Sequence, residues 1–171
     1  KKLSISQLSA YQLIKNKINE KDYLEYISPK IKNLVPNPKI FLDMEEGSLR
    51  LLKAIERKER VAVFADYDVD GTVSAALISL WLRNFSIAPT VYIPDRESEG
   101  FGPNIDAMNK LALDHSLIIC VDCGTDSEKP IRVATDRGVD VIVIDHHKAD
   151  TFSKSAYAVI NPNRFDEKNI F

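Results

Sequence analysis

The chain has 171 residues, 44% of them hydrophobic and 28% charged, which is typical of one globular domain. It lacks a run of eighteen apolar residues and opens on Lys1-Lys2-Leu3 without an apolar signal segment, so we expect no membrane span and no secretion. Two cysteines are too few for a disulfide framework, which favours a cytoplasmic protein, and a net charge of −2 excludes one that holds nucleic acid by overall charge alone.

The first sixty residues are basic and helical in pattern. They hold thirteen Lys and Arg against eight Asp and Glu, whereas residues 61–171 hold ten against seventeen. Helices are predicted over residues 5–18 and 45–58, with proline-broken loops between them. We interpret residues 1–60 as a helical lead-in that packs on the core. Its basic excess is either a solvated helical face or a contact for a polyanion.

From residue 61 onward, short β-branched runs alternate with amphipathic stretches. This alternation predicts the α/β class, with a parallel sheet and helices on both of its faces. Each predicted strand is nearly continuous in apolar residues, as expected for strands that are buried on both faces. The predicted strands are Val61–Ala65, Thr90–Pro94, Leu117–Asp122, Val139–Asp145 and Tyr157–Ile160. The predicted helices are Thr72–Phe85, Ile105–Asp114 and Asp126–Arg137.

Polar side chains follow three of these strands. Asp-Tyr-Asp-Val-Asp-Gly stands at 66–71, the third strand ends at Asp122, and the fourth ends in Asp145-His146-His147. Ligands bind beyond the carboxyl ends of parallel strands, so we expect these groups at one edge of the sheet. Converging carboxylates raise each other's pKa unless a cation lies among them. Carboxylate and imidazole ligands suit Mn²⁺, Mg²⁺ or Zn²⁺, and two such ions activate water for displacement at phosphorus. The alternative is that the aspartates only cap helices and turns.

Three other patterns lead to different interpretations. Residues 66–71 open like an EF-hand loop, but Leu77 stands where a bidentate Glu is needed, which excludes that kind of calcium site. Asp-Val-Asp-Gly-Thr at 68–72 resembles the first motif of haloacid-dehalogenase-type phosphatases, in which the first Asp is a covalent nucleophile. That alternative accounts for neither Asp122 nor the two histidines. Cys120-Val-Asp-Cys has redox or zinc spacing, but Cys120 lies within a predicted strand, which favours a small buried side chain.

Together these segments resemble the DHH phosphoesterase family, and within it the RecJ branch of single-stranded-DNA exonucleases. The resemblance runs from about Leu51 to about Phe165, and it depends on the order and spacing of the segments. They are Val-Phe-Ala-Asp-Tyr-Asp-Val-Asp-Gly at 63–71, Pro-Asp-Arg at 94–96 with Glu-Gly-Phe-Gly-Pro-Asn at 99–104, Val-Asp-Cys-Gly at 121–124, Val-Ile-Asp-His-His at 143–147 and Val-Ile-Asn-Pro-Asn at 159–163.

The resemblance implies catalysis with Mn²⁺ or Mg²⁺, with two ions in the complete enzyme. It implies that Asp68 and Asp70 are metal ligands, that Asp122 is a carboxylate shared between the metals, and that His146 is an imidazole ligand. Many members of the family have a histidine where this chain has Phe64, so the full set of ligands for two metals does not follow from these residues alone.

The same resemblance implies roles around the metals. His147 would contact the scissile phosphate, and Asp145 would orient the His pair. Asp66 would assist a ligand or hold the nucleophilic water. Arg96 would clamp a DNA phosphate, because a guanidinium fork fits phosphate oxygens. A structural salt bridge is the alternative role for Arg96.

For function, the resemblance implies that residues 61–171 are a DHH-type catalytic domain of a 5′-to-3′ exonuclease. The enzyme would act on single-stranded DNA in repair and recombination, releasing nucleoside 5′-monophosphates, with a single-strand-binding protein or a helicase as partner. The alternatives are a DHH enzyme for short oligonucleotides, cyclic dinucleotides or pyrophosphate, and a non-catalytic DHH scaffold. The family also has a fourth metal-binding Asp and a C-terminal domain. We expect these beyond Phe171, so the chain by itself should bind metal weakly and cleave poorly.

Overall fold

The computed structural model describes residues 5–168, which divide into two compact units. The first unit ends at Asn37 and the second begins at Pro38. In the first unit, helix α1 begins after Ser6, whose hydroxyl accepts a hydrogen bond from the backbone N–H of Ser9 at 3.1 Å. Short helical turns occupy part of the segment that was predicted as loops. The helices of this unit are α1 (Gln7–Lys15), η1 (Glu20–Asp22), α2 (Tyr23–Ile27) and α3 (Ile31–Leu34).

The second unit has the predicted alternation of strands and helices. Its elements, in chain order, are η2 (Pro38–Ile40), α4 (Met44–Glu56), β1 (Val61–Ala65), α5 (Val69–Arg83), β2 (Thr90–Tyr92), α6 (Ile105–Ala112), β3 (Leu117–Val121), α7 (Glu128–Thr135), β4 (Asp140–Ile144) and β5 (Ala158–Ile160). Strand β1 and its neighbours form one five-stranded parallel sheet in the order β2-β1-β3-β4-β5. The predicted α/β class is therefore confirmed.

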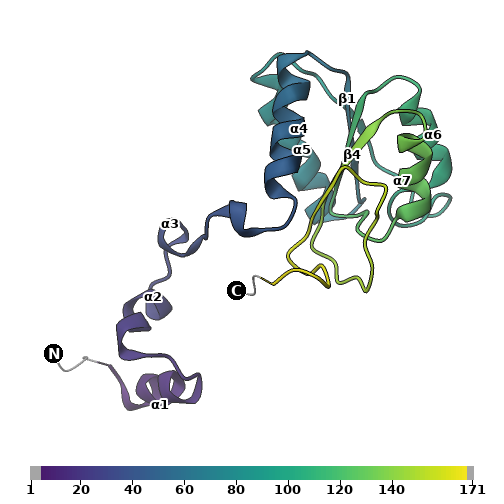
Figure 1. The fold of residues 1–171 in the computed structure, drawn as a ribbon. Helices are drawn as coiled ribbons and strands as arrows, with labels where there is room; N and C mark the ends of the chain where they lie inside the picture. The colour runs from purple at the N-terminus through teal and green to yellow at the C-terminus, as the bar shows by residue number, and fades with distance from the viewer. Residues whose placement is uncertain (1–4, 169–171) are drawn as a thin grey trace. The chain divides into compact units, whose positions relative to one another are not determined.

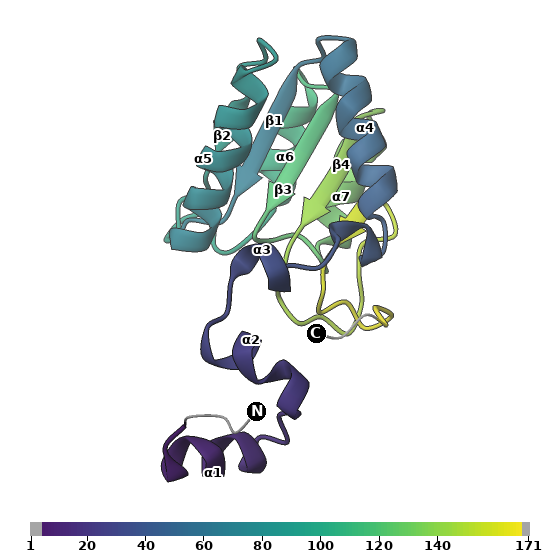
Figure 2. The ribbon, with the colours of Figure 1, turned by 90° about the vertical axis from the view of Figure 1, so that its left-hand side faces the viewer.

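Helices cover both faces of the sheet, as the right-handed crossovers of parallel strands require. Seen edge-on, α4 and α5 lie on one side of the strands and α6 and α7 on the other (Figure 1). Figure 2 looks onto the sheet from the α4 and α5 side, with the carboxyl ends of the strands at the bottom of the sheet. Alternate strand residues point to opposite faces, so two separate apolar cores result. Ala62 and Phe64 belong to the core under α6 and α7, and Val61 and Val63 to the core under α4 and α5.

Strand β2 differs from the prediction because it lies at the edge of the sheet. It ends at Tyr92 rather than at Pro94, and it pairs only with β1 in the described sheet. Thr90 and Val91 are exposed, so β2 is not buried on both faces. The apolar run alone could not separate an edge strand from a central one. The inner strands β1 and β3 are buried throughout, as predicted.

Helix α4 is part of the same compact unit as the sheet, which begins at Pro38, and the predicted division of the chain at residue 60 stays a prediction. Arg50 of α4 is only 4% exposed and forms ion pairs with Glu59 at 2.7 Å and with Asp140 of β4 at 2.5 Å. These contacts hold the helix to the amino ends of the strands. The packing of residues 1–37 on the core stays a prediction. Among the described helices, none is long and apolar enough to span a membrane.

Candidate metal centre

The order of the strands opens a crevice between the loops that follow β1 and β3. From β1 the chain crosses to β2 on one side and then returns to β3 on the other, so these two loops diverge. Ligands of doubly wound sheets bind at such a switch point, beyond the carboxyl ends of the strands. Asp66 is the residue after β1, and Asp122 is the residue after β3.

Three aspartates lie side by side across this edge, because β1, β3 and β4 are paired in register up to their last residues. In each strand the following residue is an aspartate: Asp66, Asp122 and Asp145. Their backbone N–H groups donate to the last carbonyl groups of the next strands, at 3.4, 2.8 and 3.0 Å. The register of the sheet alone thus places the three aspartates next to one another, without the help of side-chain interactions.

Two of these aspartates, both buried, form an acidic group with the exposed Asp68. Carboxylate oxygens of Asp66, Asp68 and Asp122 all lie within 4.8 Å of one another. Asp66 is 3% exposed and Asp122 is 5% exposed. Asp66 Oδ1 and Asp122 Oδ2 are buried without a hydrogen-bond partner among the described residues. Burial and, next, the neighbouring Asp68 together raise the pKa of Asp122 to about 6, although His146 and His147 lower it in part, so the charge of this carboxylate is only partly compensated.

The close approach of Gly71 shapes the loop that carries Asp66 and Asp68. A Cβ atom at Gly71 would lie 2.4 Å from the backbone oxygen of Asp66, so only glycine fits there. Asp68 caps α5 and accepts a hydrogen bond from Gly71 N–H at 3.0 Å, which lowers the pKa of Asp68. The helix therefore begins at Val69, three residues before the predicted start. The capping role and a metal-binding role are compatible, since a carboxylate has two oxygens.

The two histidines after β4 form a second group that shares Asp122. Ligand atoms of Asp122, His146 and His147 lie within 4.8 Å of one another, and His146 Nε2 is 3.0 Å from Asp122 Oδ1. Both imidazoles are substantially exposed, whereas Asp122 is buried. Asp122 belongs to both groups found among the described residues, which is the arrangement that its predicted bridging role requires. Its φ of +60° turns the chain sharply after β3.

Asp145 contacts the backbone N–H groups of both histidines. Its Oδ1 accepts hydrogen bonds from the N–H groups of His146 and His147 at 2.7 and 3.1 Å, and it lies 2.8 Å from His147 Nδ1. This contact raises the pKa of His147. Burial would raise the pKa of Asp145, but hydrogen bonds from Thr125 and His147 outweigh it and lower that pKa, so Asp145 stays ionised. The predicted orienting role has the contacts that it needs.

A polar network behind the His pair was not predicted from the sequence. Thr125 donates to Asp145 Oδ2 through its backbone N–H at 3.1 Å and its hydroxyl at 2.6 Å. Asn161 Nδ2 donates to Thr125 Oγ1 and to the backbone carbonyl of His147, both at 2.8 Å. Asn163 Nδ2 donates to the carbonyl of His146 at 2.5 Å. The Asn-Pro-Asn sequence directly after β5 is the signal that could have indicated these contacts.

Asp70, a predicted metal ligand, lies apart from the two groups described above. It is exposed in the first turn of α5 and is absent from the described groups whose ligand atoms lie within 4.8 Å. It does line a cavity of about 480 Å³ that opens beside the same edge of the sheet. The residues around this cavity are Val69, Asp70, Val73, Ser74, Asp122, Ile144, Asp145 and His146. A role for Asp70 as a ligand stays a prediction.

Arg96 lies over the loop that carries the acidic group. Its guanidinium carbon is 5.4 Å from the centre of the Tyr67 ring. Its side chain forms no salt bridge with the described residues, which does not favour the alternative structural role. Glu99 fixes the Arg96 loop by accepting hydrogen bonds from Tyr92 Oη at 2.6 Å, the backbone N–H of Asp95 at 2.9 Å and Asn104 Nδ2 at 3.1 Å. The guanidinium is thus held at the rim of the site, and its contact with phosphate stays a prediction.

The donor set fits a hard or borderline divalent cation. Three carboxylates and two imidazoles supply oxygen and nitrogen ligands, and the buried oxygens without partners are what a cation would compensate. The cysteines do not take part: Cys120 and Cys123 are buried and free, and burial raises the pKa of Cys120 to about 12, so its thiol stays protonated. Phe64 is fully buried and stacks on Tyr92, with ring centres 5.5 Å apart, so it belongs to the core.

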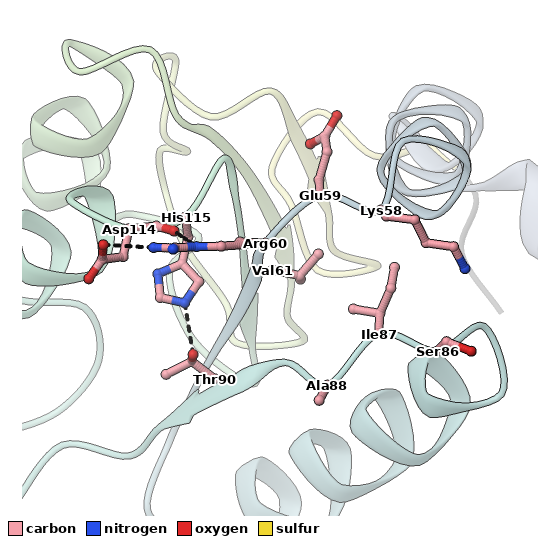
Figure 3. A pocket seen from close by; sticks show the side chains of 10 residues that line it. All are labelled: Lys58, Glu59, Arg60, Val61, Ser86, Ile87, Ala88, Thr90, Asp114 and His115. Carbon is pink, nitrogen blue, oxygen red and sulfur yellow. Dashed lines mark hydrogen bonds and ion pairs between the residues drawn. The ribbon is translucent and has the colours of Figure 1, made fainter.

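Another cavity, of about 370 Å³, lies at the opposite edge of the sheet, where β1 begins (Figure 3). Its charged groups already have protein partners. Arg60 pairs with Asp114 at 2.7 Å, Lys58 donates to the carbonyl of Phe85 at 2.5 Å, and His115 contacts Thr90 at 2.8 Å. Because these side chains already have partners within the protein, this cavity has fewer groups available to bind a ligand than the site at the carboxyl ends of the strands.

Comparison with known proteins gives the same picture. The sequence model described as "DHH family, N-terminal domain" matches residues 60–168. The single-stranded-DNA-specific exonuclease RecJ of Bacillus subtilis is 35% identical over 122 residues, which cover 71% of this chain and 16% of that protein. The RecJ of Haemophilus influenzae is 29% identical over 130 residues, covering 74% of this chain and 22% of that protein. The chain therefore spans less than a quarter of these relatives.

A solved structure agrees with the fold. A crystal structure of exonuclease RecJ bound to manganese superimposes with a TM-score of 0.68 and 27% identity, over 75% of this chain and 33% of that one. The family match covers 109 of the 171 residues, including every aspartate and histidine of the candidate metal centre. The protein belongs to the DHH family.

Proposed function

We propose that this chain supplies the catalytic centre of a divalent-metal-dependent phosphodiesterase that degrades single-stranded DNA from its 5′ end and releases nucleoside 5′-monophosphates. The proposal rests on one observation: five possible metal ligands lie close together at the switch point, namely Asp66, Asp68, Asp122, His146 and His147. Two of their buried carboxylate oxygens have no hydrogen-bond partner among the described residues. The similarity to RecJ exonucleases, one of them solved with manganese, supports the choice of DNA and of Mn²⁺.

In this proposal Asp66, Asp68, Asp122 and His146 hold Mn²⁺ or Mg²⁺. Divalent ions at such a site lower the pKa of water and neutralise charge on a phosphate. His147 has Nδ1 engaged by Asp145, so its Nε2 is the ring nitrogen left for the phosphate. Arg96 binds a neighbouring phosphate from the rim, where its guanidinium is exposed.

Single-stranded DNA is the partner in this proposal, and repair and recombination are the processes that need the reaction. A single-strand-binding protein or a helicase as a further partner stays a prediction, and so does the cytoplasmic location, which rests on the two free cysteines. Two ions, rather than one, are expected because Asp122 is shared by two groups of ligand atoms.

A single-turnover nuclease assay tests the proposal. With enzyme in excess and Mn²⁺ present, 5′-labelled single-stranded DNA should yield labelled mononucleotide, and EDTA or Asp122→Asn should abolish the product. Blunt duplex DNA of the same sequence should be spared. Cleavage of a dinucleotide, a cyclic dinucleotide or pyrophosphate without cleavage of the long strand would assign the chain to another DHH substrate class. Since slow cleavage is expected of this chain by itself, the absence of both Mn²⁺ binding and Mn²⁺-dependent cleavage on all of these substrates would contradict the proposal.

A further inference from the structure

Both backbone carbonyl groups of the His pair are held by the side-chain amides of asparagines from the segment after β5. Asn163 Nδ2 donates to the carbonyl of His146 at 2.5 Å, and Asn161 Nδ2 donates to the carbonyl of His147 at 2.8 Å. The backbone N–H groups of the same two residues donate to Asp145 Oδ1. The backbone of this two-residue turn is therefore fixed from both directions.

The two asparagines act as one unit. Asn161 Oδ1 accepts a hydrogen bond from the backbone N–H of Asn163 at 2.7 Å, which places the second amide under the carbonyl of His146. Asn161 is 1% exposed, and its Nδ2 also reaches Thr125 Oγ1, which in turn donates to Asp145. Each donor and acceptor of the Asn161 amide is thereby used, so its orientation is determined.

This arrangement matters because the imidazoles have few packing contacts, of which the edge-on contact of the His147 ring with Phe101, with ring centres 5.5 Å apart, is one. The His146 side chain is 58% exposed and the His147 side chain is 45% exposed. Among the described residues, the ring of His146 contacts Asp122 and the neighbouring ring of His147. The position of the His146 ring therefore depends on the backbone that carries it, and that backbone is fixed by Asp145 and the two asparagines.

We propose that Asn161 and Asn163 are positioning residues of the metal centre, which set its affinity for a divalent cation by holding the backbone of His146 and His147. Side chains that orient metal ligands commonly change affinity by about 10- to 100-fold when they are removed. Asn163 is the better residue to test, because it is exposed and its replacement leaves the core intact. Asn161 is buried, and its loss would also leave the hydroxyl of Thr125 with one partner fewer.

The test compares Asn163→Ala and Asn163→Asp with the wild type and with Asn109→Ala. Asn163→Ala removes the donated hydrogen bond without adding a charge, whereas Asp keeps the shape of Asn, cannot donate to the carbonyl of His146 and adds a negative charge. Asn109 of α6 is the matched control, since its side chain also makes a hydrogen bond, which Oδ1 accepts from Arg137 Nε at 3.2 Å. Two quantities are measured in each protein: the dissociation constant for Mn²⁺ by calorimetry, and deuterium uptake of the peptide containing residues 145–147 in the metal-free state.

Both Asn163 variants should bind Mn²⁺ at least about tenfold more weakly and exchange faster over residues 145–147, with unchanged melting temperatures. Asn109→Ala should behave like the wild type in both measurements. Unchanged exchange and unchanged affinity in both Asn163 variants would overturn the inference. The inference rests on the proposed function only for its metal readout: if the wild type itself fails to bind Mn²⁺, the proposed function fails, while the exchange measurement still decides whether Asn163 holds the turn.

Discussion

Asp122 Oδ1 lies 3.0 Å from His146 Nε2, while the other oxygen of the same carboxylate is buried without a partner among the described residues. One side chain thus joins the acidic group that follows β1 to the histidines that follow β4. It does so at a cost to the metal-free protein, because burial and the neighbouring Asp68 raise the pKa of Asp122 to about 6, and the two histidines compensate its charge only in part.

The first prediction is that Asp122→Asn stabilises the metal-free chain. A folded pKa raised from 3.8 to about 6 means that the Asp122 carboxylate costs stability as pH rises through this range and remains costly above it. Removing the charge should therefore raise the free energy of unfolding at pH 8 by about 1–3 kcal/mol. Asn also tolerates the φ of +60° at this position, which Ala tolerates less well.

The measurement is urea unfolding of both proteins in EDTA at pH 8 and again at pH 4.5. The difference between them should shrink at the lower pH, where Asp122 of the folded wild type is already protonated. A variant that is less stable than the wild type at pH 8 would show that the carboxylate is compensated within the protein, contrary to this interpretation.

The second prediction concerns the glycine under the acidic loop. Gly71→Ala should destabilise the fold by about 1–3 kcal/mol or more, because its Cβ would lie 2.4 Å from a backbone oxygen that has no room to move. Gly138→Ala is the control: it has a positive φ of 79° but nothing within 4 Å of the added atom, so it should cost about 1 kcal/mol. Thermal unfolding compares the two, and equal losses would show that the close approach at Gly71 is not the constraint.

The third prediction uses the hydrogen bonds that hold the loop before β5. Glu128 of α7 accepts hydrogen bonds from Ser153 Oγ at 2.9 Å and from the Ser155 N–H and Oγ at 3.1 and 2.8 Å, and it also pairs with Arg132. Burial raises the pKa of Glu128, but these hydrogen bonds outweigh it and lower the pKa to about 2. Glu128→Gln should cost about 1–3 kcal/mol at pH 7.

The sign of its pH dependence follows from the lowered pKa. The contribution of Glu128 is fully present above the unfolded value of 4.5 and is lost as pH falls toward about 2. The gap in stability between wild type and Glu128→Gln should therefore close between pH 4.5 and pH 2, as measured by thermal unfolding across that range. Glu56→Gln, at an exposed position at the end of α4, should show no such gap at any pH.

The fourth prediction concerns Arg96. If its guanidinium binds a DNA phosphate, Arg96→Ala should weaken binding to single-stranded DNA about tenfold and lower the slope of log affinity against log salt by about one. Fluorescence anisotropy in Ca²⁺, at several salt concentrations, measures both. Arg137→Ala removes an exposed arginine near the amino edge of the sheet and should change neither. If Arg96→Ala has the same salt dependence as the wild type, Arg96 does not contact a phosphate of the DNA.

The sequence predicted the class of fold and the edge at which the site lies, for a physical reason. A strand buried on both faces must be apolar, so an aspartate directly after such a run marks where the strand ends and where a ligand edge begins. Asp66, Asp122 and Asp145 were all found in this way, and the pairing of β1, β3 and β4 in register then places them side by side.

Other features depend on contacts that one sequence does not encode locally. The resemblance implies that Asp70 is a metal ligand together with Asp68, and this stays a prediction, since Asp70 is exposed in the first turn of α5 and outside the described groups of ligand atoms. The roles of Thr125, Asn161 and Asn163 arise only when β5 lies beside β4, since their partners are 14 to 36 residues away. The exposed edge position of β2 has the same origin, because its apolar residues give no indication of how many neighbours the strand will have.

The most direct test of the central claim is calorimetric titration of the metal-free chain with Mn²⁺ at pH 7.5, for the wild type, Asp122→Asn and Asp136→Asn. Asp122 belongs to both groups of ligand atoms, whereas Asp136 is an exposed residue at the end of α7. We predict that the wild type and Asp136→Asn bind Mn²⁺ equally and that Asp122→Asn loses at least about a hundredfold in affinity. Equal Mn²⁺ affinity in all three proteins would contradict a metal centre at the carboxyl edge of this sheet.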